Sequence, residues 1–265
     1  MLLTYSDVIG KTKTILERSL IEKAGYENGW ENVIDSREGS VVLASARHRA
    51  QVLILPRPAD KGWIVEVPPG LLFQELIRSL PEIGQLDDKL IAGNMDELVR
   101  LLYRAARLAM SMPNQAALTY SVRVQDALNQ TGIDTTEIYR MVKQRIGQDT
   151  FREALMDYWA GACAVTGIVL PEILRASHAK PWADCVSDEE RLDVFNGFLL
   201  CANLDALFDR GLITFDDAGY LVCASLLSPD QRRRLNLHEN LKLRWLTSSH
   251  LPYLAWHRER VFSKA

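Results

Sequence analysis

The sequence lacks the long apolar run that a membrane-spanning helix requires, roughly 18 or more consecutive apolar residues. Its first residues, MLLTYSDVIGK, also lack the basic segment followed by a long apolar segment that marks a secretory signal. Cysteines are few, and Cys163, Cys185, Cys201 and Cys223 show none of the spacings of a disulfide framework. These absences predict a protein of the reducing cytoplasm that does not interact with membranes.

An excess of positive charge is also missing. The 31 lysines and arginines are outnumbered by 34 aspartates and glutamates, which gives a formal net charge of -3. Nucleic-acid binding therefore has no global sign in the composition, although many nucleases rely on a local basic patch. The content of 48% hydrophobic and 25% charged residues is typical of a globular protein. A length of 265 residues fits one large domain or two of ordinary size.

The first part of the chain, residues 1–115, predicts a small α+β domain. A helix is expected over residues 6–24, with Ser6 or Asp7 as its N-cap and Gly25 as its end. Runs rich in Val and Ile then predict strands in GWENVIDS, SVVLASARH, RAQVLILP and GWIVEVP. The pattern becomes helical again in LLFQELIRSL and over residues 94–112, and MPNQ is the expected joint to the rest of the chain.

The second part, residues 116–265, carries the residues with chemical potential. A helical stretch, TTEIYRMVKQRIGQDTFREALMDYWAG, leads into CAVTGIVLPEILRASHAKPW, which predicts a strand ending at a histidine. A polar loop, an Asn-Gly turn, a short apolar strand and the helical run NLDALFDRG follow. In that run, Asp205 and Asp209 are four residues apart and share one helical face. The residues alone leave three interpretations of this pair: surface charges, a cap with a solvated neighbour, and the floor of a metal site.

This order of elements resembles the HNH nuclease superfamily, whose ββα-metal motif joins two strands and a helix around a metal ion. SHAKPW, NGFLL and NLDALFDRG are similar to the motifs of a restriction-type subgroup, and the tail LPYLAWHRERVF resembles how that subgroup ends. The resemblance covers about residues 135–262. It implies a helical segment and a C-terminal ββα-metal nuclease domain. With the N-terminal α+β domain expected from residues 1–115, the whole chain is predicted to be α+β. The resemblance also implies a metal-dependent DNA endonuclease acting in restriction or phage defence.

The resemblance gives catalytic roles to His178 and Asn196. A histidine with an ordinary pKa near 6.5 can take a proton from water at cellular pH, so His178 is the expected general base. Asn196 would pin the loop that orients this histidine. Each residue also has a structural explanation, because a histidine at a strand end often serves packing and Asn before Gly is common in turns.

Asp205 and Asp209 are the expected metal ligands. A carboxylate near the start of a helix also favours the helix dipole, so Asp205 has an explanation without metal, with Asn203 as the N-cap. That explanation does not extend to Asp209. Many relatives carry histidines at these two positions and a ligand at that of Ser177, a poor ligand. A site made of carboxylates alone favours Mg²⁺ or Mn²⁺ over zinc.

Two further expectations concern zinc and DNA. Cys163 and Cys201 each lack the partner that would complete a CxxC pair, so we expect no structural zinc. Double-stranded DNA is the expected partner, because basic side chains near the motif could contact phosphates. The candidates are Lys180, Arg210, Arg140, Lys143 and Arg145, although each also fits an ordinary solvated surface.

The resemblance also suggests a role for residues 1–115, because a ββα nuclease core alone has little preference for a DNA sequence. A separate domain commonly supplies target choice, so this part of the chain is expected to recognise DNA or to regulate the enzyme. No helix-turn-helix or zinc finger is readable in it. A homodimer is compatible with the sequence. The alternative function is a non-catalytic DNA-binding or regulatory protein with a degenerate HNH fold, which Ser177 and the missing histidines favour.

Overall fold

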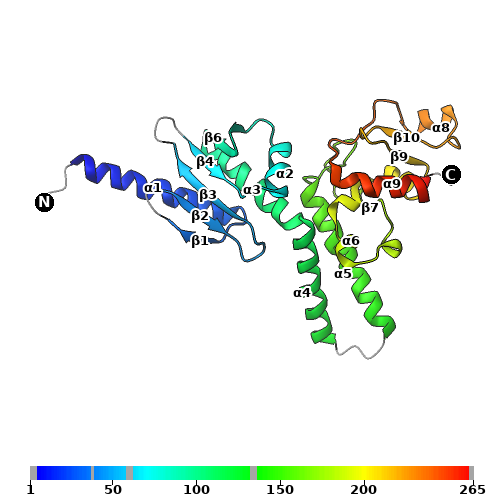
Figure 1. Ribbon diagram of the computed structural model, residues 1–265, viewed down its shortest axis with the longest axis horizontal. Coiled ribbons are helices and arrows are strands. Elements are labelled where there is room, and N and C mark those ends of the chain that lie inside the picture. Colours follow the sequence, from blue (N-terminus) through cyan, green and yellow to red (C-terminus); the bar gives the residue numbers. More distant parts are fainter. Residues whose placement is uncertain (1–4, 37–38, 58–61, 132–135, 263–265) are drawn as a thin grey trace. The chain divides into compact units, whose positions relative to one another are not determined.

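The computed structural model describes residues 5–36, 39–57, 62–131 and 136–262, with the side chains of 15–36, 39–57, 62–129 and 139–262. The chain divides into two compact units, residues 1–110 and 111–265. Both units combine helices and strands, which confirms the predicted α+β class (Figure 1). In the described part of the chain, no helix is long and apolar enough to cross a membrane.

The first unit is built on a six-stranded antiparallel sheet with the order β1-β2-β3-β4-β6-β5 (Figure 1). One face of the sheet is buried, because alternate residues such as Val41, Leu43, Val52 and Ile54 are at most 1% exposed. The strands are β1 (Asn32–Asp35), β2 (Val41–Ala44), β3 (Gln51–Pro56), β4 (Trp63–Glu66), β5 (Gly84–Leu86) and β6 (Lys89–Ala92). The helices are α1 (Tyr5–Glu27), α2 (Leu71–Ser79) and α3 (Met95–Ser111).

Two features of this unit differ from the sequence-based prediction. Helix α1 does not end at Gly25 but continues to Glu27. Gly25 serves packing instead, because a Cβ at this position would lie 2.5 Å from Cδ1 of Leu43. The β5–β6 hairpin was not predicted, since all three residues of β5 are exposed and give no apolar pattern. The side chains of Ser6 and Asp7, the predicted N-caps, lie outside the described residues.

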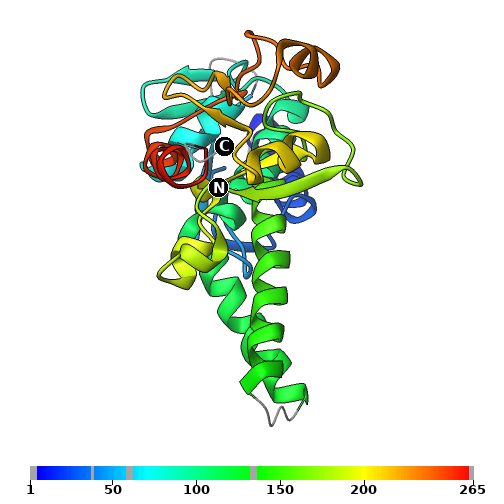
Figure 2. The ribbon, with the colours of Figure 1, turned by 90° about the vertical axis from the view of Figure 1, so that its right-hand side faces the viewer.

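The second unit begins with a helical hairpin. Helices α4 (Pro113–Thr131) and α5 (Thr136–Tyr158) lie side by side, as Figures 1 and 2 show. The sequence predicted α5 but not α4, whose first residues were interpreted as a joint. Proline is well suited to a first helical position because its missing N–H would have no partner there. Pro113 therefore begins a helix where the sequence suggested a break.

The remainder of the second unit contains the predicted strand–loop–strand–helix order. Strands β7 (Leu174–His178) and β8 (Gly197–Cys201) pair antiparallel, with His178 opposite Gly197, and α7 (Ala202–Asp209) follows directly. Gly197 permits this close pairing, since a Cβ there would lie 2.5 Å from the carbonyl oxygen of Ser177. The other elements are α6 (Asp188–Arg191), β9 (Ile213–Phe215), β10 (Leu221–Cys223), α8 (Pro229–Arg234) and α9 (Leu251–Arg260).

Candidate active site

His178 is the last residue of β7, and its ring is held from two sides. It stacks on Phe151 of α5, with ring centroids 3.7 Å apart and an angle of 14° between the planes. Its Nε2 lies 2.9 Å from the carbonyl oxygen of Arg191. Because a carbonyl oxygen only accepts hydrogen bonds, Nε2 carries the proton and the lone pair of the neutral ring is on Nδ1. Within the described part of the chain, Nδ1 has no hydrogen-bond partner.

The pKa of His178 differs from the ordinary value assumed from the sequence. Burial lowers it to about 4, and the hydrogen bond to the Arg191 carbonyl only partly opposes this effect. The ring is therefore neutral at cellular pH, so that its Nδ1 lone pair is available in nearly every molecule. The intrinsic basicity of the ring is correspondingly lower than that of an exposed histidine.

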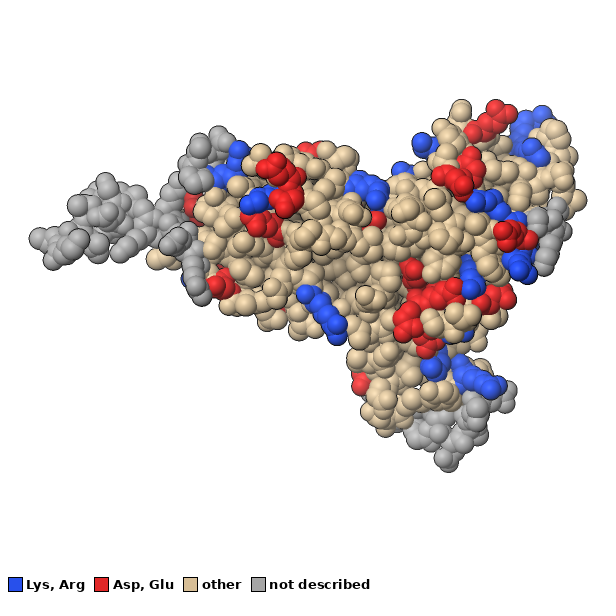
Figure 3. All heavy atoms as spheres, in the orientation of Figure 1, with Lys and Arg blue, Asp and Glu red and all other residues tan. Residues whose placement is uncertain are grey.

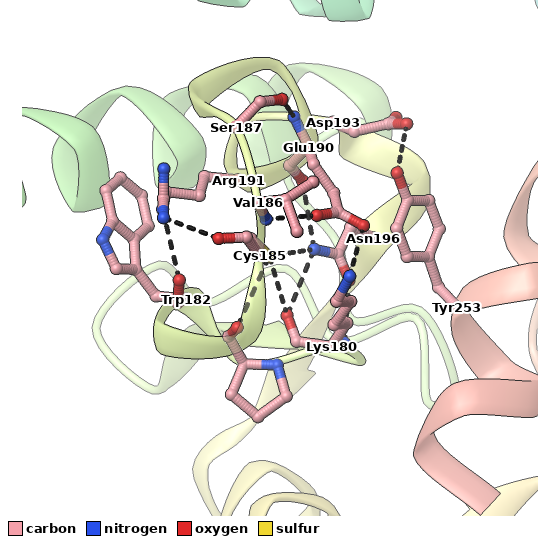
Figure 4. A network of polar contacts seen from close by, with 11 residues as sticks. Lys180, Trp182, Cys185, Val186, Ser187, Glu190, Arg191, Asp193, Asn196 and Tyr253 are labelled. Carbon is pink, nitrogen blue, oxygen red and sulfur yellow. Dashed lines mark hydrogen bonds and ion pairs between the residues drawn. The ribbon is translucent and has the colours of Figure 1, made fainter.

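Asn196 holds together the two ends of the loop between β7 and β8 (Figure 4). Its side chain is fully buried. Oδ1 accepts a hydrogen bond from the backbone N–H of Lys180 at 2.8 Å, and Nδ2 donates to the carbonyl oxygens of Lys180 at 3.2 Å and Glu190 at 3.1 Å. Nδ2 also lies 3.3 Å from Sγ of Cys185. These contacts can perform the role expected for Asn196, the pinning of the loop beside the histidine.

Asp205 is fixed by a neighbour of the histidine. The hydroxyl of Ser177, which is 1% exposed, donates a hydrogen bond of 2.5 Å to Oδ1 of Asp205. Ser177 therefore orients a carboxylate from the position where many HNH proteins carry a ligand. The contact joins β7 to α7 and links Asp205 to the residue that directly precedes His178.

The predicted N-cap of α7 was wrong. Helix α7 begins at Ala202, so Asn203 lies inside its first turn, and Cys201 stands at the cap position without a side-chain hydrogen bond. The backbone N–H of Ala202 donates to the carbonyl oxygen of Ile173 instead. Pairing of the two strands thus fixes the start of the helix, which removes the need for a side-chain cap.

Asp209 is the last residue of α7, where a carboxylate is disfavoured by the helix dipole. The surrounding protein and the nearby charge of Asp205 raise the pKa of Asp209 to about 6, and Arg210 partly opposes them. Like charges four residues apart on a helix destabilise it, and a cation bound between them would reverse this effect. The arrangement therefore combines two carboxylates that repel each other on an exposed helix end.

The fit of a metal ion to these residues depends on which ion is considered. No group of three or more His, Cys, Asp or Glu residues that could hold a metal occurs among the described residues. Two carboxylates alone cannot supply the four protein ligands of a tetrahedral structural zinc site. Magnesium, in contrast, binds through one or two carboxylates and takes its other ligands from water and phosphate. Asp205 and Asp209 fit Mg²⁺ or Mn²⁺ on these grounds.

The isolated cysteines make hydrogen bonds within the fold. Cys163 and Cys201 are both buried, and Thr166 lies between them. The Thr166 backbone N–H is 3.5 Å from Sγ of Cys163, and its hydroxyl is 3.4 Å from Sγ of Cys201. Thr166 takes the place that the second cysteine of a CxxC pair would have.

The two candidate lysines are engaged within the protein. Nζ of Lys180 forms an ion pair of 2.7 Å with Glu190, and the lysine side chain is only 14% exposed. Nζ of Lys143 lies 3.6 Å from a carboxylate oxygen of Asp188 and 5.9 Å from the ring centroid of Tyr120. Both lysines thus support α6 and the loop that contains it.

The three candidate arginines differ from the two lysines in their exposure and in their contacts. Arg140, Arg145 and Arg210 are exposed, and none has a hydrogen bond or ion pair within the part of the chain that the structure describes. Arg210 directly follows Asp209. Among the candidate phosphate contacts, the two lysines are therefore paired with carboxylates of the protein, whereas the three arginines are not paired within the described residues.

His257, in the C-terminal tail of the chain, supports the site from helix α9. It is 1% exposed and stacks on Phe208 with parallel rings 3.9 Å apart. Its Nε2 donates to the carbonyl oxygen of Phe208 at 3.1 Å, and its Nδ1 accepts from the hydroxyl of Thr214 at 3.0 Å. His257 thereby connects α9 to the end of α7, next to Asp209. The signal in the sequence was its place in the tail WHRER.

Replacement of His257 by glutamine is expected to flatten the pH dependence of stability. Burial lowers the pKa of His257 to about 4, whereas the unfolded chain binds the proton near pH 6.5. The stability that this residue contributes is complete above about pH 6.5 and is lost as the pH falls toward 4. Between pH 7 and pH 5 this contribution falls by about 2 kcal/mol, so His257→Gln should lose about 2 kcal/mol less stability than the wild type over this range.

The measurement is urea unfolding of the wild type and the variant at pH 7 and pH 5. Comparing each protein with itself cancels a constant packing defect. The exposed His238 provides the control, since His238→Gln should keep the wild-type pH dependence. An equal loss of stability in His257→Gln and the wild type would contradict the expectation.

Comparison with known protein families assigns the region just described. Residues 163–216 match the family of HNH endonucleases. The matched segment contains β7, the loop held by Asn196, β8, α7 and β9, and so confirms the resemblance to HNH nucleases over these residues. This segment of the chain is therefore similar to an HNH nuclease domain, a family that acts on nucleic acids and generally uses a divalent metal ion. No curated protein matched the chain.

Proposed function

We propose that the protein is a metal-dependent DNA endonuclease that acts in restriction or phage defence in the cytoplasm. The observation that carries the proposal is the hydrogen bond from Ser177 to Asp205. It connects the carboxylate helix to the strand end that carries a neutral, oriented histidine. Ordinary packing explains the histidine or the serine separately, but not the combination with two mutually repelling carboxylates on α7.

His178 is the general base in this proposal. Its Nδ1 accepts a proton from the water molecule that attacks the phosphorus atom. The resulting positive ring keeps its hydrogen bond from Nε2 to the Arg191 carbonyl, which stabilises the charge that develops. A base must keep its lone pair free, so His178 acts outside the set of metal ligands.

Asp205 and Asp209 hold the divalent ion. Ser177 occupies Oδ1 of Asp205, which leaves the second oxygen of that carboxylate for the ion. Mg²⁺ or Mn²⁺ bound there would neutralise charge on the phosphate and on the departing 3′ oxygen. The exposed Arg210 would contact a phosphate oxygen beside Asp209.

Surface charge favours one direction of approach for double-stranded DNA. Acidic side chains gather around α6 in the view of Figure 3, and α6 itself has the sequence Asp-Glu-Glu-Arg. The phosphate backbone is repelled there. In this proposal the DNA lies against α7, and the exposed Arg210, Arg140 and Arg145 are the candidate backbone contacts. The first unit would choose the target sequence or modification.

Cleavage of plasmid DNA in the presence of Mg²⁺ or Mn²⁺ tests the proposal. Unmodified and modified phage DNA are tried beside the plasmid, and the wild type should cut at least one of these substrates. Asp205→Asn and Asp209→Asn should each reduce Mn²⁺ affinity and cleavage at least about tenfold, because each removes a charge that holds the ion. Asn at position 205 can still accept the Ser177 hydrogen bond, so this variant isolates the charge.

Asp230, an exposed residue of α8, is the matched control, and Asp230→Asn should bind Mn²⁺ and cut DNA as the wild type does. Unchanged Mn²⁺ affinity in both α7 variants would remove these aspartates as ligands. If the wild type leaves all DNA intact with both metals, the non-catalytic DNA-binding alternative is favoured.

A further inference from the structure

We propose that Arg191 is a positioning residue that sets the tautomer and orientation of His178. The backbone carbonyl of Arg191 accepts the hydrogen bond from Nε2 of His178. Its side chain fixes the place of that carbonyl by holding the loop around it. The structural part of this inference stands without any activity, and its catalytic consequence rests on the proposed function.

The guanidinium of Arg191 holds three parts of the loop together, and Figure 4 shows its contacts with Trp182 and Cys185. Nη2 donates to the carbonyl oxygen of Cys185 at 2.6 Å, and Nε donates to that of Trp182 at 3.2 Å. Nη1 donates to a carboxylate oxygen of Asp188 at 3.0 Å. The guanidinium carbon also lies 5.6 Å from the centroid of the Trp182 ring. The planar fork of arginine suits this set of acceptors, which a lysine cannot reproduce.

The loop needs such a tie because its helix is too short to be stable alone. Helix α6 spans only Asp188–Arg191, and isolated helices of this length do not persist in water. Ser187 caps its start by accepting a hydrogen bond from the backbone N–H of Glu190. Its end has carbonyl groups without helical partners, and Arg191 carries one of them. The contacts of the Arg191 side chain therefore decide where this carbonyl lies.

Two consecutive carbonyls of α6 serve the two motif residues. The carbonyl of Glu190 accepts from Asn196, and the carbonyl of Arg191 accepts from His178. A shift of α6 would therefore disturb both residues together. Asn196 holds the ends of the loop, whereas Arg191 holds its middle, so the two have separate tasks.

The expected chemical effect concerns the proton on the imidazole ring. With the Arg191 carbonyl in place, the proton is on Nε2 and Nδ1 is the base. If the carbonyl moves away, the ring also populates the tautomer with the proton on Nδ1, which cannot accept a proton from water at that nitrogen. The fraction of active molecules and the orientation of the ring are both reduced, while the surface that binds DNA is unchanged.

The test compares the wild type with Arg191→Gln and Arg191→Lys. Nitrogen-15 NMR of the histidine side chains should show one tautomer for His178 in the wild type, protonated on Nε2, and a mixture of tautomers in Arg191→Gln. His178→Gln assigns the resonance. In cleavage assays, kcat should fall at least about tenfold in Arg191→Gln with little change in KM, and Arg191→Lys should recover only part of the loss.

Arg232 provides a matched control, because its Nε and Nη2 also donate to two backbone carbonyls, those of Leu227 and Ala224. Arg232→Gln should keep the wild-type tautomer and kcat. If Arg191→Gln does not fold, Arg191→Lys and Asp188→Asn give the same readings with smaller changes. A single Nε2-protonated tautomer in every Arg191 variant that folds would overturn the inference. An inactive wild type with the expected tautomers would refute the proposed nuclease and leave the positioning role intact.

Discussion

His178→Ala is expected to reduce the rate of DNA cleavage by about 10²–10⁴-fold, the usual contribution of a general base. The nitrogen that accepts the proton from water is lost, whereas Asp205 and Asp209 remain. Mn²⁺ affinity should therefore stay at the wild-type level. The measurement is the single-turnover rate of plasmid cleavage at saturating Mn²⁺, which excludes effects on DNA release.

A second substitution separates the base from its packing. Alanine leaves a void beside Phe151, whose ring stacks on the histidine. His178→Gln fills more of this space and keeps an N–H group for the Arg191 carbonyl, but it offers no basic nitrogen. Both variants should therefore be equally inactive, and His257→Gln should retain substantial cleavage. Wild-type rates in either His178 variant would show that the base assignment is wrong.

Asn196→Ala is expected to cause a large loss of stability in the second unit. The amide is fully buried, and its removal leaves the N–H of Lys180 and the carbonyl of Glu190 without their partner. Each buried polar group left unpaired costs about 1–3 kcal/mol, so a total of roughly 3–5 kcal/mol is expected. Cleavage should be lost as well, because the loop that orients His178 is released.

Urea unfolding followed by tryptophan fluorescence measures this loss. Asn196→Asp is the informative second variant, because it keeps the acceptor for Lys180 but places a negative charge against two carbonyl oxygens. It should be at least as unstable as Asn196→Ala. Asn203→Ala is the control, since Asn203 is exposed and does not cap α7. A change in Asn196→Ala as small as that of the control would contradict the expectation.

Local patterning explains which parts of the fold could be predicted. A strand ending at His178, the Asn196-Gly197 turn and the helix carrying Asp205 all depend on residues close in sequence. Helix α4 and the β5–β6 hairpin were missed because their own residues carry weak or contrary signals. Pro113 resembles a break in the chain, and β5 has no buried side chain. Their structure depends on packing against partners elsewhere in the chain.

The candidate site was only partly predictable for a related reason. Spacing alone indicated that Asp205 and Asp209 share a face. The low pKa of His178 and the hydrogen bond from Ser177 to Asp205 require tertiary neighbours that no local pattern specifies. Likewise, the sequence could not show that Lys180 is paired with Glu190 while Arg210 has no hydrogen bond or ion pair among the described residues.

The loop that Asn196 closes can accept insertions during evolution. Asn196 joins Lys180 to Glu190, so the chain between these two residues is already closed. Doubling the length of a closed loop costs only about 0.6 kcal/mol. Its tip at Val186 is 87% exposed. Insertions beside Val186 can therefore diversify the outer surface, or carry a fused peptide, at little cost in chain entropy. The hydrolytic residues keep their positions only if Cys185 keeps its contact with Arg191 and Ser187 its contact with Glu190.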